Sequence, residues 1–186
     1  MPAYSAEDFT VVTSAGDYIG RFRDAERFAP LCRECGNYGR SWGCPPFECD
    51  IVGRLRSYSR LLLVATKIMP RESGLPIGES RRLILPERIR LEARLRELEK
   101  EFDGLSCSYS CSCLHCPESQ CTRPDGNPCR HPDLVRPSLE GLGFDMGRTV
   151  SELFGFGMVW GENGKMPEYL TIVCGLFFNS ERTPVL

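Results

Sequence analysis

Cysteine is the residue that most constrains this chain, because ten of its eleven cysteines fall in two short regions. The first region spans residues 32–49 and the second spans residues 107–131. The remaining one, Cys174, lies in an apolar run typical of a buried strand, where a thiol behaves as a small hydrophobic group. Cysteines this dense either form disulfides that cross-link the chain or bind a metal or cofactor. The redox state of the compartment decides between these two roles.

The amino terminus and the apolar stretches indicate where such a chain works. The first residues lack the basic segment followed by an apolar run that marks a secretory signal. The longest apolar stretch, residues 61–65, is too short to span a bilayer. We therefore expect a soluble, cytoplasmic protein that does not enter a membrane. Reducing compartments disfavour stable disulfides, so the cysteines indicate metal or redox chemistry.

The spacing of the cysteines is typical of metal ligands. Each region contains one Cys-x-x-Cys pair, which lets two thiolates on a tight turn face a shared metal. Further cysteines after short loops complete each set. The candidate metal ligands are Cys32, Cys35, Cys44 and Cys49 in the first region, and Cys113, Cys116, Cys121 and Cys129 in the second. The second region can supply four thiolates by itself, which makes it a strong metal-binding pattern.

The pattern favours iron–sulfur over zinc. Structural zinc sites usually combine two Cys-x-x-Cys pairs, or one such pair with histidines. Here each pair is followed by irregularly spaced cysteines, and Cys44 is followed directly by Pro45, as in the Cys-Pro end of bacterial ferredoxin runs. We expect one or two iron–sulfur clusters of the 4Fe–4S type, with zinc as the alternative. The spacing leaves open whether the regions form one shared centre or two separate ones.

Several residues in the two regions admit more than one role. Cys49 is either the fourth ligand of the first region or a residue at a helix start. Cys107 and Cys111 are surplus to a four-thiolate set. His131 follows Cys129 closely, where it is a ligand, a residue supporting a ligand, or a surface residue.

Aromatic and basic residues among the cysteines also have two interpretations. Tyr38, Trp42 and Phe47 either shield a metal from water or are ordinary core residues. Arg130 and Arg136 offset the thiolate charge, bind an anionic substrate, or are simply solvated.

Hydrophobic patterning predicts an α/β or α+β fold, with a small mixed sheet, helices, and the cysteine-rich loops gathered on one side. Residues 60–69 form a continuous apolar run typical of a strand buried on both faces. Residues 86–102 have a helical pattern with one apolar stripe. The stripe consists of Leu91, Leu95, Leu98 and Phe102. We expect a single domain over residues 1–186.

Three further segments complete the prediction. Residues 9–12 and 18–20 are predicted to be short extended pieces. A helix or turn is predicted from residue 137, capped by Ser138. Residues 157–179 are predicted to form a β-hairpin with a longer loop.

Two stretches, CRECGNYGRSWGCPPF and NPCRHPDLVRPSLEGLGFD, resemble a bacterial and archaeal family of predicted metal-binding proteins known as domain of unknown function 2284. The resemblance runs from Cys32 to the final strands. It implies a cysteine-bound metal centre in a cytoplasmic protein, without an established reaction. It assigns Cys32, Cys35 and Cys44 to the first family motif, and Cys113, Cys116, Cys121 and Cys129 to the second. Cys107 and Cys111 lie outside the family pattern.

These features lead to one function and two alternatives. We expect an iron–sulfur protein that transfers electrons with a redox protein partner or holds a cluster for a partner. The alternatives are an enzyme whose cluster has an open iron for Lewis-acid or sulfur chemistry, and a structural zinc module for protein contacts. A formal net charge of −2 gives no indication of nucleic-acid binding. The sequence contains no P-loop or dinucleotide-binding glycine motif, so no residue is assigned a catalytic role.

Overall fold

A four-stranded sheet with the strand order β1-β2-β4-β3 organises the computed structural model, which describes residues 3–109, 113–117 and 120–186. Its strands are β1 (Tyr4–Ser14), β2 (Arg60–Pro70), β3 (Leu105–Cys107) and β4 (Leu170–Phe178). All three pairings are antiparallel, and an isolated parallel bridge joins Ser108 to Ser138 after β3. The predicted α/β or α+β class is confirmed.

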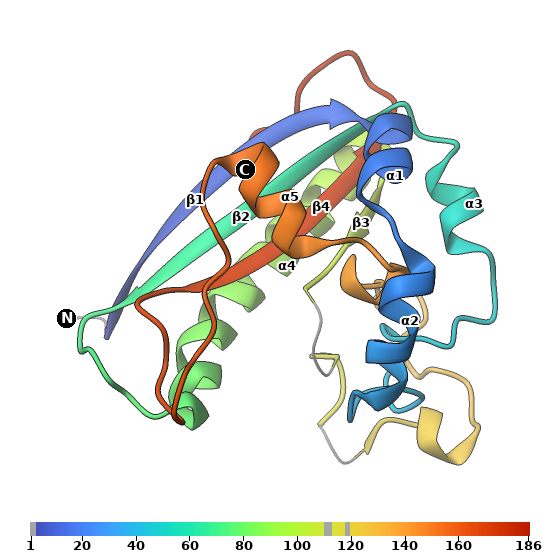
Figure 1. Cartoon of the computed structure of the whole chain (residues 1–186). Helices are drawn as coiled ribbons and strands as arrows, with labels where there is room; N and C mark the ends of the chain where they lie inside the picture. The colour runs from blue at the N-terminus through green and yellow to red at the C-terminus, as the bar shows by residue number, and fades with distance from the viewer. Residues whose placement is uncertain (1–2, 110–112, 118–119) are drawn as a thin grey trace.

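Helices cover both faces of this sheet. They are α1 (Ala15–Phe22), α2 (Ala25–Glu34), α3 (Ile51–Leu55), α4 (Ser80–Phe102) and α5 (Met146–Phe154). The short 3-10 turns are η1 (Ile77–Glu79), η3 (Arg123–Asp125) and η4 (Glu140–Leu142). In Figure 1, α4 lies behind the sheet and α5 in front of it, while α2 and the described parts of the cysteine-rich loops lie together on the β3 side of the sheet.

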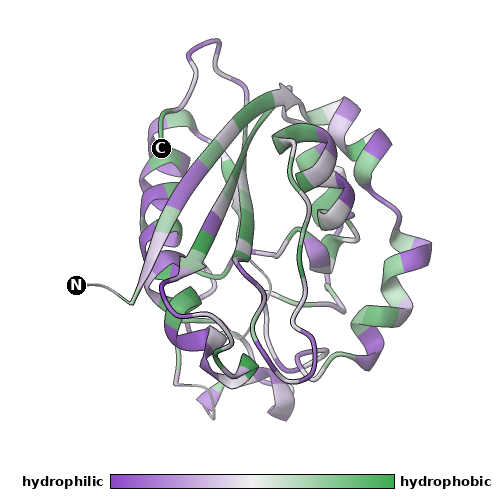
Figure 2. Ribbon diagram, turned by 60° about the vertical axis from the view of Figure 1, so that its left-hand side comes forward, coloured by the Kyte–Doolittle hydropathy of each residue, from purple (hydrophilic) through white to green (hydrophobic). Residues whose placement is uncertain are grey.

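Alternating residues of β2 and β4 build two hydrophobic cores, because successive side chains of a strand point to opposite faces. The core shared with α1, α3 and α5 includes Leu61, Leu63, Val173, Phe177, Tyr18, Leu55 and Val150. The core shared with α4 includes Leu62, Val64, Ile172, Leu176, Leu91 and Leu95. Among the described residues buried in these cores, Cys107 alone comes from a cysteine-rich region. Figure 2 shows the hydrophobic residues concentrated along the strands.

The two longest predicted elements are confirmed. Strand β2 is buried on both faces over most of its length. The predicted stripe of α4 faces the core, with Leu91, Leu95 and Leu98 each 1% exposed. The helix starts six residues before the predicted Pro86, at Ser80. Burial of Leu83 in this first part outweighs the backbone hydrogen bond that Pro86 cannot make.

Three local predictions were wrong. Residues 18–20 lie in α1, where Tyr18, Ile19 and Phe22 are buried on one helical face and the Ser14 side chain caps the helix. The carboxy-terminal hairpin is absent from the described residues, since β4 pairs with β2 and β3 instead. The N-cap residue of η4 is Leu139 and not the predicted Ser138, although Ser138 Oγ accepts a hydrogen bond from the Gly141 N–H at 3.0 Å.

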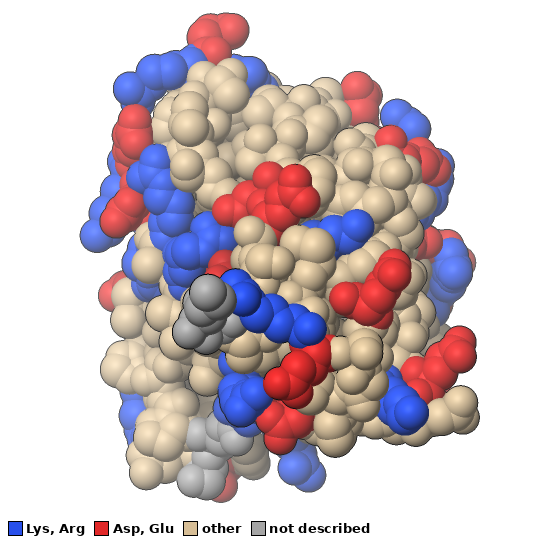
Figure 3. Space-filling view, turned by 90° about the vertical axis from the view of Figure 1, so that its left-hand side faces the viewer, with Lys and Arg blue, Asp and Glu red and all other residues tan. Residues whose placement is uncertain are grey.

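Two further observations concern the charged side chains on the surface and the apolar character of the helices. On the face drawn in Figure 3, acidic and basic side chains are interspersed and do not gather by sign. Across the described part of the chain, the helices are either too short or too polar to cross a membrane.

Candidate metal centre

The first cysteine region begins at the end of α2. Cys32 lies in the last turn, and Cys35 caps the helix by donating its backbone N–H to the Cys32 carbonyl at 3.1 Å. The chain then turns through Gly39, whose φ of 67° favours glycine, and the Gly39 N–H bonds the Pro45 carbonyl at 2.9 Å. This closed loop returns Cys44 toward the end of α2.

The thiols of this loop influence one another. Burial raises the pKa of the Cys44 thiol to about 11, with further contributions in the same direction from the thiols of Cys35 and Cys32. Burial and the Cys35 thiol also raise the pKa of Cys32. Negative charge on the Cys32 and Cys44 thiols is therefore costly, so protons neutralise these two thiols until a cation takes their place.

Cys49 lies at the start of α3. It is exposed and immediately precedes Asp50, the residue whose side chain caps α3. The predicted position at a helix start is therefore confirmed. Cys49 lines a cavity of about 290 Å³ together with Cys32, but it does not contribute to the shifted pKa of Cys44. Its role as a ligand stays a prediction.

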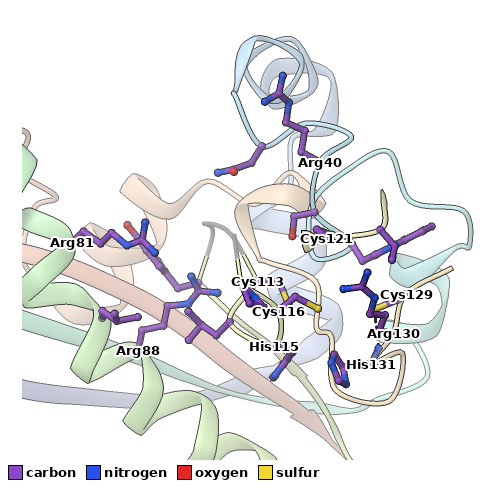
Figure 4. A pocket seen from close by; sticks show the side chains of 18 of the residues that line it. Arg40, Arg81, Arg88, Cys113, His115, Cys116, Cys121, Cys129, Arg130 and His131 are labelled. Carbon is purple, nitrogen blue, oxygen red and sulfur yellow. Dashed lines mark hydrogen bonds between the residues drawn. The ribbon is translucent and has the colours of Figure 1, made fainter. Parts of the chain in front are cut away.

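The four candidate ligands of the second region line one cavity of about 560 Å³ (Figure 4). They are Cys113, Cys116, Cys121 and Cys129. Burial raises the pKa of Cys113, the Cys129 thiol raises it further, and the Arg88 guanidinium opposes the shift. The backbone N–H of His131 donates to Cys129 Sγ at 3.3 Å, a bond that stabilises a thiolate.

The surplus cysteines have different environments. Cys107 lies in β3 and is fully buried in the core, so it packs as a hydrophobic residue. Cys111 lies outside the described residues. Among the two histidines, His115 Nε2 lies 3.1 Å from the Leu134 carbonyl oxygen, and His131 shares the cavity wall with it. Whether His131 binds metal stays a prediction.

Basic side chains surround the same cavity. The side chains of Arg40, Arg81, Arg88 and Arg130 contribute to its wall (Figure 4). Arg88 is only 5% exposed and pairs with Glu92 at 2.8 Å. Arg136 is close to Arg130 in the sequence, but its guanidinium donates two hydrogen bonds to the Glu99 carboxylate, at 2.6 and 2.8 Å. The cavity wall therefore carries positive side chains beside the thiols.

Arg123 joins the two cysteine regions, and sequence reasoning missed it. Its guanidinium donates to the backbone carbonyls of Ser41, Cys44 and Pro46, and it lies over the Trp42 ring at 4.8 Å. It is 9% exposed and lies two residues after Cys121. The first region also forms part of the wall of the second region's cavity, through residues that include Gly36, Arg40 and Trp42.

The donor chemistry fits a thiolate-held metal. All ten described cysteines are free thiols. Within the described residues, no three His, Cys, Asp or Glu side chains converge closely enough to hold one ion as they stand, so binding would bring the thiols closer together. Trp42, in the cavity wall, has a buried Nε1 without a hydrogen-bond partner among the described residues. A nearby thiolate or sulfide would accept that hydrogen bond.

A comparison with protein families identifies the family of this chain. The family model described as "Predicted metal-binding protein (DUF2284)" matches residues 20–177, which include every cysteine of the chain. The chain belongs to this family. No curated protein and no solved structure is detectably similar to it. Membership in DUF2284 supports metal binding by this chain and leaves the ligating residues and the identity of the metal open.

Proposed function

We propose that the chain is an iron–sulfur protein that transfers electrons with a redox partner protein or carries a cluster for that partner. The observation that supports it most is the cavity lined by Cys113, Cys116, Cys121 and Cys129. The first region adds three thiols nearby, and Arg123 connects the two groups. This thiol count exceeds the four ligands of one structural zinc ion, whereas iron–sulfur clusters are held by sets of cysteine thiolates.

The hydrophobic cores argue against a purely structural metal. Small zinc domains fold only with metal because they lack enough apolar surface to bury. Here the buried core residues come almost entirely from outside the cysteine regions. The body of the protein is therefore able to fold on its own, which leaves the metal available for chemistry.

Residues of the chain would prepare the thiols for a cluster. Arg88 partly offsets the raised pKa of Cys113, and the His131 N–H donates a hydrogen bond to Cys129 Sγ. The side chains of Ile84, Leu85 and Leu114 in the cavity wall limit contact with water. A bound cluster would supply one-electron redox chemistry. The proposal includes a reducing compartment such as the cytoplasm, where free thiols persist.

An absorption spectrum tests this function. Protein purified without oxygen should be brown, and titration with dithionite should bleach the visible band as each cluster takes up an electron. A colourless protein that contains stoichiometric zinc would contradict the proposal.

Catalysis is the second candidate function, and the size of the cavity favours it. A volume of about 560 Å³ matches cavities that bind small molecules, which range from about 300 to about 1,000 Å³. Its four arginines suit an anionic substrate. An enzyme with an open iron should change its spectrum when small carboxylates or phosphates are added, whereas the spectrum of an electron carrier should change only on reduction.

A further inference from the structure

A groove of about 1,010 Å³ is lined by α4, by the second cysteine region and by the segment that follows that region. Its apolar side chains include Leu85 and Ile89 from α4, and Leu114 and Leu134 from the other segments. Ile89 is 54% exposed and Leu134 is 37% exposed, so both are among the large apolar side chains that the fold leaves in contact with water. A groove that gathers exposed apolar side chains is typical of a surface on which another molecule docks.

The groove reaches the thiols of the metal cavity. Cys113 and Cys116 line both the groove and the cavity of about 560 Å³. Both residues are only partly buried. A cluster held by these thiols would therefore lie close to any molecule that fills the groove. Such a short path between the two redox groups is what electron transfer between proteins requires.

The charged side chains around the groove and the cavity are mostly basic. Among the described residues, the two are lined by one acidic side chain, Glu92, and by Arg40, Arg81, Arg88, Arg96 and Arg130 (Figure 4). Glu92 pairs with Arg88 at 2.8 Å. Arg96 and Arg130 donate to the uncharged carbonyls of Leu134 and Gln120, and these bonds leave their positive charge in place. Since the whole chain has a formal net charge of −2, the excess of positive charge is local to this face.

We propose that this groove docks a redox partner protein whose surface is acidic around an apolar centre. This inference rests on the proposed electron-transfer function and describes the partner of that function. Apolar contact with Ile89 and Leu134 suits a protein surface better than a nucleic acid, which is bound mainly through its phosphates. One electron would pass from the reduced cluster to the oxidised redox group of the partner. Attraction between opposite charges speeds the encounter of two proteins, and salt weakens it.

Cytochrome c provides a matched pair of probes. The native protein has a basic surface, and succinic anhydride converts its lysines into carboxylates while the haem stays the same. Each haem accepts one electron from a reduced cluster. The full chain, purified and reduced without oxygen, should reduce the succinylated probe several-fold faster than the native probe at about 20 mM salt, and most of this advantage should vanish at about 500 mM salt.

Variants of the full chain locate the docking surface. Ile89→Glu removes apolar contact and adds negative charge within the groove, so reduction of the succinylated probe should slow several-fold. Ile89→Lys removes the same contact without the repulsion and should slow it less. Ile77→Glu is the control, since Ile77 is 44% exposed and lies outside the lining of the groove, and it should behave as the wild type. Arg96→Gln should slow reduction of the succinylated probe but not of the native one.

The outcomes separate docking from the function on which it rests. Wild-type protein without iron and sulfide, or protein that reduces neither probe, would end both proposals. Equal rates for the two probes at low salt, or wild-type rates in Ile89→Glu, would overturn the acidic partner alone. A wild-type dimer that Ile89→Glu converts to monomers, measured by light scattering, would assign the groove to a second copy of the chain and would also overturn it. Rates are expressed per cluster, and Ile89→Glu decides the question if Arg96→Gln loses its cluster.

Discussion

The two cysteine regions differ in how far the fold shapes them before metal binds. In the first, the end of α2 and a hydrogen-bonded loop already bring three thiols within reach of one another. In the second, four thiols are spread around a cavity of about 560 Å³. The first region is therefore the more preorganised of the two, although in neither region do three described side chains converge closely enough to hold one ion before metal binds. Preorganised ligands pay less conformational entropy on binding.

Removing a thiol of the second region should have the largest effect. Cys113→Ala or Cys129→Ala takes a ligand from a centre that depends on all four thiols, so about half of the iron should be lost if each region holds a cluster. Iron analysis of protein purified without oxygen checks this. Full iron retention in both variants would mean that these cysteines are not ligands.

Arg123→Ala should have the next largest effect, because it leaves three backbone carbonyls without their donor. We expect a loss of about 3 kcal/mol in the unfolding free energy of the metal-free protein, and less iron in both regions. Arg123→Lys restores the charge without the planar fork and should recover part of the loss. Urea unfolding and iron analysis measure the two effects, with the exposed Arg56→Ala as control. Normal iron content in Arg123→Ala would show that the regions are independent.

Lower pH should weaken metal binding to a moderate degree. The pKa values of Cys32, Cys44 and Cys113 are raised, so these thiols carry protons near neutral pH and must release them to bind metal. The apparent affinity should fall about tenfold per pH unit for each proton displaced. Competition with a chelator at several pH values measures this slope. A flat profile would show that the thiols are already ionised.

Cys174→Ala should have the smallest effect. Cys174 is 2% exposed and packs in the hydrophobic core shared with α4, and it belongs to neither cysteine region. Its loss leaves a small void that costs about 1 kcal/mol. Metal content should stay at the wild-type level, and a marked loss of iron would contradict the separation between structural and ligating cysteines.

Strand β2 and the apolar stripe of α4 could be predicted from the sequence. Each has a periodic pattern that depends only on one element and on the core that the element faces. The segment at Tyr18 failed, since a short apolar run fits a helix or a strand equally well. The carboxy-terminal hairpin failed because β4 takes its partners from distant strands.

The cysteine spacing indicated the ligand groups, but it could not indicate what connects them. Arg123 bonds backbone carbonyls that lie 77 to 82 residues away, and a carbonyl is present at every residue. Glu140 likewise meets Cys32 only through folding, across 108 residues. Contacts of this kind depend on the tertiary structure and leave no local pattern in the sequence.

Iron, zinc and acid-labile sulfide per chain, measured on protein purified without oxygen, test the central claim most directly. We expect about four irons and about four sulfides for each cluster, with little zinc. Stoichiometric zinc without sulfide would contradict it and would make the cysteines of both regions structural zinc ligands.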